Sequence, residues 1–153
     1  MITKTQIMDA AAEQLQTLFP EMTLYRNRTP TNFARPSALI SLTGETMACR
    51  TSQTVSRGIT LVLDLFVEVD DYHFSQIDTL NAMADVVMEH FSAPALPVSD
   101  RALDIGQIKC EVNYDYAEIS IPLSWDDTRK LETEQRELIE SLKLNINISK
   151  QQE

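Results

Sequence analysis

The most constraining feature of the sequence is the segment 59–69, in which apolar and polar residues alternate. Its apolar members on one face are Ile59, Leu61, Leu63, Leu65, Val67 and Val69. An alternation with a period of two predicts a β-strand, because successive side chains of a strand point to opposite faces of its sheet. Val62 and Phe66 fall on the second face, so we expect that face to be partly covered as well.

Similar patterns predict further elements before and after this strand. Apolar residues at helical spacing predict helices over about residues 5–19 and 75–91. A strand is expected at 37–42, with a hairpin tip near 43–45 and a return strand that starts at Met47.

The second half of the chain adds a hairpin and a charged helix. Two segments with alternating apolar residues, 107–114 and 118–125, predict an antiparallel hairpin in which Cys110 lies on the apolar face. A highly charged helix is expected over about residues 127–144, with a polar tail after it.

Together these elements predict a single α+β domain, which suits a length of 153 residues. We expect a mainly antiparallel sheet of four to five strands packed with two helices, plus a C-terminal helix. Residues 1–126 are assigned to the α+β domain, and residues 127–153 to the C-terminal helix and polar tail.

Charge and composition exclude several classes of function. The net charge of −10 argues against a general nucleic-acid binder, which needs clustered Lys and Arg, and against docking on an anionic membrane. The sequence shows no targeting signal, and no apolar run reaches the length of a membrane span. Two distant cysteines, Cys49 and Cys110, are expected to be free thiols in a cytoplasm.

Enzyme motifs are weak throughout. Asp70, Asp71 and His73 could form an acid–base or metal site, but a lone cluster after a strand favours a solvated turn. With three scattered glycines, the chain cannot form a glycine-rich phosphate loop. We therefore predict no catalytic residue, no metal and no cofactor.

Two segments are better suited to contacts between protein subunits than to catalysis. The polar, β-branched stretch 43–58 could form an arm that extends a neighbouring sheet, or it could be a mobile loop. In the predicted C-terminal helix, the apolar residues must pack on their own domain or on an adjoining copy; they are Leu131, Leu138, Ile139 and Leu142.

Two short motifs within this layout resemble a known family. The first helix ends in Leu18-Phe19-Pro20, and the first long strand is preceded by an aromatic-x-Arg-Pro motif, here Phe33-Ala34-Arg35-Pro36 and then Ser37-Ala38-Leu39-Ile40. With the order of elements over about residues 3–126, they make the chain similar to the tail terminator proteins of long-tailed bacteriophages and related prophage elements. The segment from Asp127 onward is outside the resemblance.

The resemblance implies a structural virion-assembly protein that caps the end of the tail tube as a ring, commonly a hexamer. The ring stops tube elongation and offers a surface for head–tail joining. Its partners are copies of itself, the tail tube protein and the head–tail connector protein; DNA only passes through the channel, and no membrane is involved. The protein is made in the host bacterial cytoplasm and resides in the virion tail. The residues we predict at subunit interfaces are Phe33, Arg35, Arg50, Gln53, Val55 and Arg57.

Four alternatives remain at this point. The chain could be a neck or head–tail connector protein, or a tail tube protein, of the same assembly. It could also be a small acidic adaptor that acts as a dimer. An enzyme would require stoichiometric metal near Asp70, Asp71 and His73.

Overall fold

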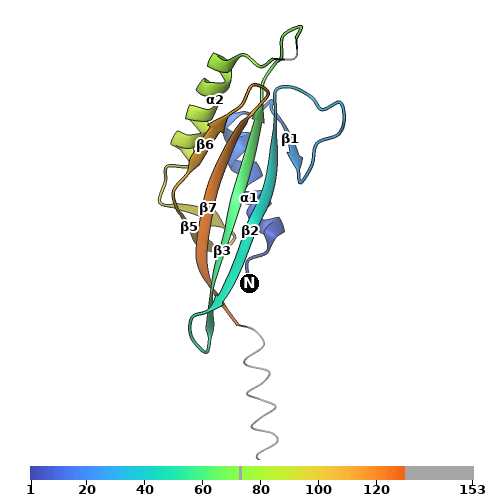
Figure 1. The fold of residues 1–153 in the computed structure, drawn as a ribbon. Helices are drawn as coiled ribbons and strands as arrows, with labels where there is room; N and C mark the ends of the chain where they lie inside the picture. The colour runs from blue at the N-terminus through green and yellow to red at the C-terminus, as the bar shows by residue number, and fades with distance from the viewer. Residues whose placement is uncertain (73, 130–153) are drawn as a thin grey trace, which may run out of the picture.

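The computed structural model describes residues 1–72 and 74–129, which form two helices and a seven-stranded sheet (Figure 1). The elements in chain order are α1 (Lys4–Leu18), β1 (Thr23–Arg26), β2 (Ser37–Cys49), β3 (Thr54–Phe66), α2 (Ile77–His90), β4 (Ala95–Val98), β5 (Arg101–Ile105), β6 (Lys109–Val112) and β7 (Ala117–Thr128). No helix among these residues is long and apolar enough to span a membrane.

The sheet is mixed and curled around the first helix. Its strand order is β1-β2-β3-β7-β5-β4, and β6 pairs with β7 beside β5. β1 runs parallel to β2, while every other pair is antiparallel. Because α1 packs against both β2 and β4, which lie far apart in the strand order, the sheet must bend around it.

The core lies between the two helices and the inner face of the sheet. β3 supplies the apolar series that the alternation predicts, and its members Ile59, Leu61, Leu63 and Leu65 are buried. The helices contribute one stripe each, formed by Ile7, Ala11 and Leu15 in α1 and by Leu80, Ala84 and Val87 in α2. Thr3 caps α1 through a capping box with Gln6, which fixes where this helix begins.

The predicted fold class is wrong in the number and arrangement of strands. The described chain is mostly β, with a curled, half-barrel-like sheet of seven strands instead of four to five antiparallel ones. β1 is only four residues long and pairs in parallel, so it carries no clear alternation. β4 contains Pro97, which an edge strand tolerates because its missing N–H need not enter the ladder.

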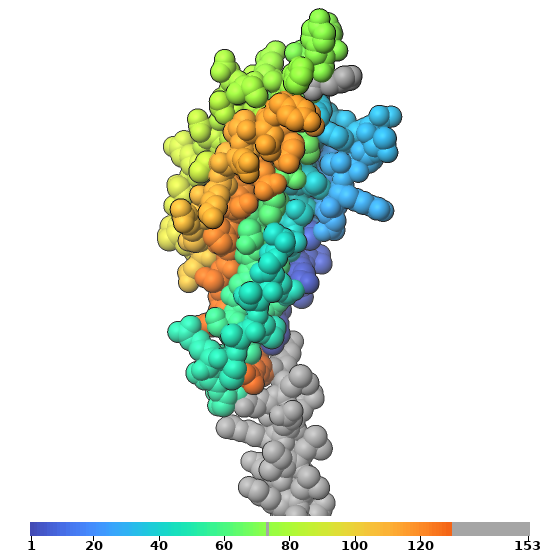
Figure 2. Space-filling view, in the orientation of Figure 1, coloured from blue at the N-terminus to red at the C-terminus, as the bar shows by residue number. Residues whose placement is uncertain are grey.

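The first hairpin is longer than predicted. The strands β2 and β3 continue past the expected tip at 43–45 and turn at residues 50–53 instead. Gly44, with a φ of +66°, lies at a register shift between Thr43 and Thr46, so it accommodates a bulge and not a turn. We call residues 43–58 the arm; in Figure 2 it projects from the lower end of the molecule.

The last strand also extends beyond the predicted domain core. β7 continues to Thr128, and Asp127 and Thr128 pair with Val55 and Thr54 of the arm. The helix predicted from residue 127 therefore does not start there. The rest of the predicted C-terminal helix, residues 130–153, lies outside the described residues.

Replacing Leu63 by alanine tests the role of β3 as the centre of the core. Leu63 is fully buried, so Leu63→Ala should lower the free energy of unfolding by about 3 kcal/mol, as measured by urea denaturation. The neighbouring Val62→Ala, on the half-covered face, should cost clearly less. Equal losses for the two variants would contradict the assignment of the two faces.

Candidate assembly interface

The structure separates the six predicted interface residues into two groups. Phe33 and Arg35 precede the start of β2, whereas Arg50, Gln53, Val55 and Arg57 belong to the arm. β2 has 13 residues, which at about 3.3 Å per residue puts roughly 40 Å between the two groups. Because the two groups are this far apart, a single contact between two copies can use one group without the other.

Phe33 and Arg35 form a stacked cluster with the end of β3. The ring of Phe33 lies 4.7 Å from that of Phe66, and the Arg35 guanidinium lies 4.8 Å from the Phe33 centroid. Arg35 also donates to the carbonyl of Val67 at 3.0 Å and pairs with the Asp115 carboxylate at 2.9 Å. The Arg35 side chain is only 17% exposed, so its contacts first hold the loop before β2 against the turn before β7.

The arm exposes a long stretch of strand edge. Residues Thr43–Cys49 of β2 are all exposed, and β1 pairs only with Ser37–Ile40. Within residues 1–72 and 74–129, no strand pairs with the outer edge of β2 beyond Ile40. Unpaired N–H and C=O groups along such an edge can pair with a strand of another chain.

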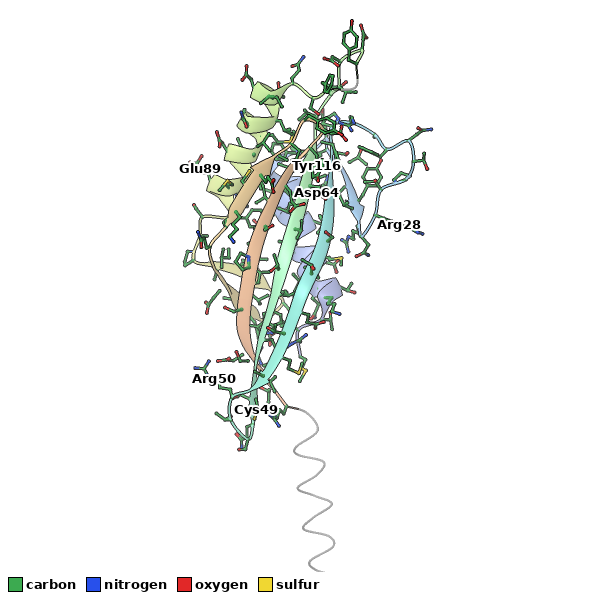
Figure 3. All side chains as sticks on the ribbon, viewed as in Figure 1. Arg28, Cys49, Arg50, Asp64, Glu89 and Tyr116 are labelled. Carbon is green, nitrogen blue, oxygen red and sulfur yellow. The ribbon has the colours of Figure 1, made fainter. Side chains whose placement is uncertain are left out.

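The tip of the arm carries the two exposed members of the predicted set. Arg50 is 62% exposed and pairs with Asp126 of β7 at 3.2 Å, and Figure 3 labels it at the lower end of the molecule. Gln53 is exposed as well, and its carbonyl accepts from the backbone N–H of Arg129 at 3.0 Å. The Thr51 hydroxyl accepts from the backbone N–H of Gln53 and of Thr54, which fixes the turn.

The other two arm residues are buried. Val55 is 5% exposed and Arg57 is 8% exposed. Arg57 donates to the carbonyl of Ile2 at 2.7 Å and to the carboxylate of Glu45 at 2.8 Å, and its guanidinium stacks 5.0 Å from the Trp125 centroid. This arginine binds its own chain on several sides.

A buried carboxylate completes this network at the root of the arm. Oδ2 of Asp127 accepts from the Ile2 backbone N–H at 3.0 Å, from Nε1 of Trp125 at 2.9 Å and from Arg57 at 3.3 Å. Burial alone would raise the pKa of Asp127, but these hydrogen bonds and the charge of Arg101 lower it below its usual value. We call Ile2, Arg57, Trp125 and Asp127 the clasp.

The clasp was missed by sequence reasoning, and no local signal could have revealed it. Its members come from the N-terminus, β3 and the end of β7, so they meet only when the sheet is complete. Arg57 looked like a surface residue because its neighbours in the sequence are polar.

A row of carboxylates crosses the open face of the sheet. Asp64 of β3 pairs in register with Glu118 of β7, which pairs with Glu111 of β6, so the three side chains share one face. Burial, and then the charge of Glu118, raises the pKa of Asp64 to about 6. Burial and the nearby carboxylates also raise the pKa of Tyr116, which Figure 3 labels beside Asp64.

The weaker sequence candidates take structural positions where the structure describes them. The Asp70 carboxylate accepts from the backbone N–H of Tyr72 and of Phe74, both at 2.9 Å, which forms a turn. His73 lies outside the described residues. Cys49 and Cys110 are free thiols; Cys110 pairs with the buried Ile119 and so lies on the predicted apolar face of β6, although its side chain is exposed there.

Comparison with known proteins gives one family match. A family model described as "Phage tail terminator protein" matches residues 6–135, a span that includes all seven strands and α2. No curated protein matches the sequence.

Replacing Arg57 by alanine should destabilise the fold strongly, because Asp127 would stay buried with one cationic partner removed. We expect a loss of about 3 kcal/mol in the free energy of unfolding, measured by urea denaturation. Arg50→Ala removes an arginine that pairs at the surface, and it should change the same quantity by less than about 0.5 kcal/mol. If Arg57→Ala left the free energy of unfolding unchanged, the structural role of the clasp would be ruled out.

The carboxylate row should make stability depend on pH. The folded protein holds a proton on Asp64 more tightly than the unfolded chain does, so Asp64 makes the wild type more stable as the pH falls from about 6 toward 3.8. Asp64→Asn should remove this component and raise stability at pH 7 by about 1 kcal/mol, since solvent screens a half-buried group. Thermal denaturation against pH measures both effects, with a substitution of the exposed Asp104 of β5, Asp104→Asn, as the control. If the stability of Asp64→Asn depended on pH in the same way as that of the wild type, the raised pKa of Asp64 would be refuted.

Proposed function

This chain belongs to the phage tail terminator family, and on that premise we propose that it caps the end of the tail tube as a closed ring of identical copies. Proteins of this family are structural, and membership in it supports a role in tail assembly. In the proposed complex, a hexameric ring stops tube elongation and presents a surface for head–tail joining. The tail tube protein contacts one side of the ring, the head–tail connector protein contacts the other, and DNA passes through the channel.

The observation that carries this proposal is the exposed arm. A ring needs heterologous contacts, in which one surface of a copy meets a different surface of the next. The open edge over Thr43–Cys49 offers backbone groups for such a contact, and the clasp fixes the arm at its root. The arm therefore suits an element that reaches a neighbouring subunit.

The six predicted residues divide into two roles under this proposal. Arg50 and Gln53 at the tip contact the neighbouring subunit directly, and the half-exposed Phe33 contributes at the opposite end. Arg35, Val55 and Arg57 contribute indirectly, because their contacts within the subunit maintain the conformation of the loop before β2 and of the arm. Only the first group is suitable for an interface test by substitution.

The net charge of −10 is compatible with a channel for DNA. Acidic walls avoid strong binding of phosphates, which would hold the DNA in place. The carboxylate row adds three acidic side chains to the face of the sheet that points away from the core.

The mass in solution tests the ring directly. Light scattering on a size-exclusion column, over a range of concentrations, should give a discrete species of six times 17.3 kDa. A tight dimer whose mass does not change with concentration would contradict the ring and favour the adaptor alternative.

A charge reversal at the arm tip should weaken assembly without unfolding the subunit. Arg50→Glu should raise the dissociation constant of the ring about tenfold, which corresponds to about 1.4 kcal/mol, while the circular dichroism stays unchanged. The matched control is Arg28→Glu, an equally drastic change on the exposed loop after β1 (Figure 3). Equal effects of the two variants would exclude a specific role for the arm tip.

A further inference from the structure

An apolar groove runs between the end of α1 and the start of α2. It consists of two adjoining hollows, of about 400 Å³ and 230 Å³, that share Pro36 and Met83. Its apolar lining comes from Leu18, Phe19, Pro36, Val67 and Met83. Nothing within residues 1–72 and 74–129 fills this groove, so it is a candidate docking surface.

Each of the two hollows has one carboxylate in its wall. Glu21 borders the hollow at the end of α1, and Glu68 borders the hollow near the start of α2; both are exposed. A matching ligand therefore has an apolar face with a cation on either side.

The sequence after residue 129 carries this pattern. Ile139 belongs to the apolar series at helical spacing, and Leu138 and Leu142 flank it. Arg136 precedes Ile139 by three residues and Lys143 follows it by four, so in the predicted helix both cations lie next to Ile139 on one face. The apolar side chain of Ile139 and these two cations thus complement the groove, while the four glutamates among residues 131–143 carry no contact in this pairing.

The groove of the same copy is out of reach. The described chain ends at Arg129, whose N–H binds Gln53 at the arm tip, whereas Pro36 and Val67 lie at the opposite end of β2 and β3. The 13 residues of β2 separate the two ends by about 40 Å. Ten residues from Arg129 to Ile139 span about 15 Å as a helix and at most about 36 Å when fully extended.

We propose that the segment 131–143 of one copy docks in the groove of the neighbouring copy, with Ile139 on Met83 and with Arg136 and Lys143 beside Glu21 and Glu68. Segment and groove are different surfaces, so each copy gives one contact and receives one, as a closed ring requires. This inference deepens the proposed ring by naming a second contact, separate from the arm.

Disulfide trapping in the full-length chain tests the pairing. The cysteine pair Met83→Cys and Ile139→Cys is introduced into a Cys49→Ser, Cys110→Ser background, with copper phenanthroline and O₂ as the oxidant. We expect a ladder of multiples of 17.3 kDa on non-reducing gels, which a reductant abolishes. In the matched control, Ile139→Cys is replaced by Glu137→Cys on the other side of the predicted helix, and cross-linking should fall at least tenfold.

Three results would overturn the inference: no cross-link, a cross-link within one monomer, or equally fast cross-linking of the control. The mass of the same sample before oxidation separates this failure from that of the proposed function. If rings form but no cross-link appears, the docking is refuted and the proposed ring is not. If the protein is instead a dimer at every concentration and no cross-link appears, the docking and the ring are both refuted.

A charge swap provides an independent measurement. Arg136→Glu with Lys143→Glu should weaken association about tenfold in sedimentation velocity, and adding Glu21→Lys with Glu68→Lys should restore it. Failure of the second pair to rescue the first, in variants with unchanged circular dichroism, would show that these four charges do not meet.

Discussion

The buried carboxylate of Asp127 holds together the N-terminus, the root of the arm and the end of β7. An isolated charge in a protein interior is very costly, so Asp127 remains ionised through the donors that Ile2, Trp125 and Arg57 supply and through the nearby charge of Arg101. These donors come from the N-terminus, the arm and β7, and the charge therefore ties three distant parts of the chain together. It gives the arm a rigid root and fixes where the chain leaves the sheet.

The same sheet leaves two different surfaces available for assembly. One is the open edge of β2 along the arm, and the other is the groove between α1 and α2, near the opposite end of the strands. In the proposed ring, each of them meets a different surface of the next copy, so the contacts are heterologous. Such contacts close into a ring when the rotation between neighbours allows it, and a ring can cap a tube.

The sequence was informative where its patterns were periodic. The alternation in 59–69 and the helical stripes of α1 and α2 predicted the core, whereas β4 and β5 are too short to show a period. The turn expected at Gly44 is a bulge. A glycine can adopt a positive φ in a turn and in a bulge alike, so its presence does not distinguish the two. For the candidate interface, the polar arm was visible, but the burial of Arg57 depends on partners that are distant in the sequence.

In the proposed function, this protein ends the growth of the tail tube. The most direct measurement is the length of tubes that the tail tube protein of the same phage forms with and without this chain, measured by electron microscopy. We expect shorter tubes in its presence, each with ring-shaped density at one end and no growth after more tube protein is added. Unchanged lengths, with the protein absent from the tube ends, would contradict it.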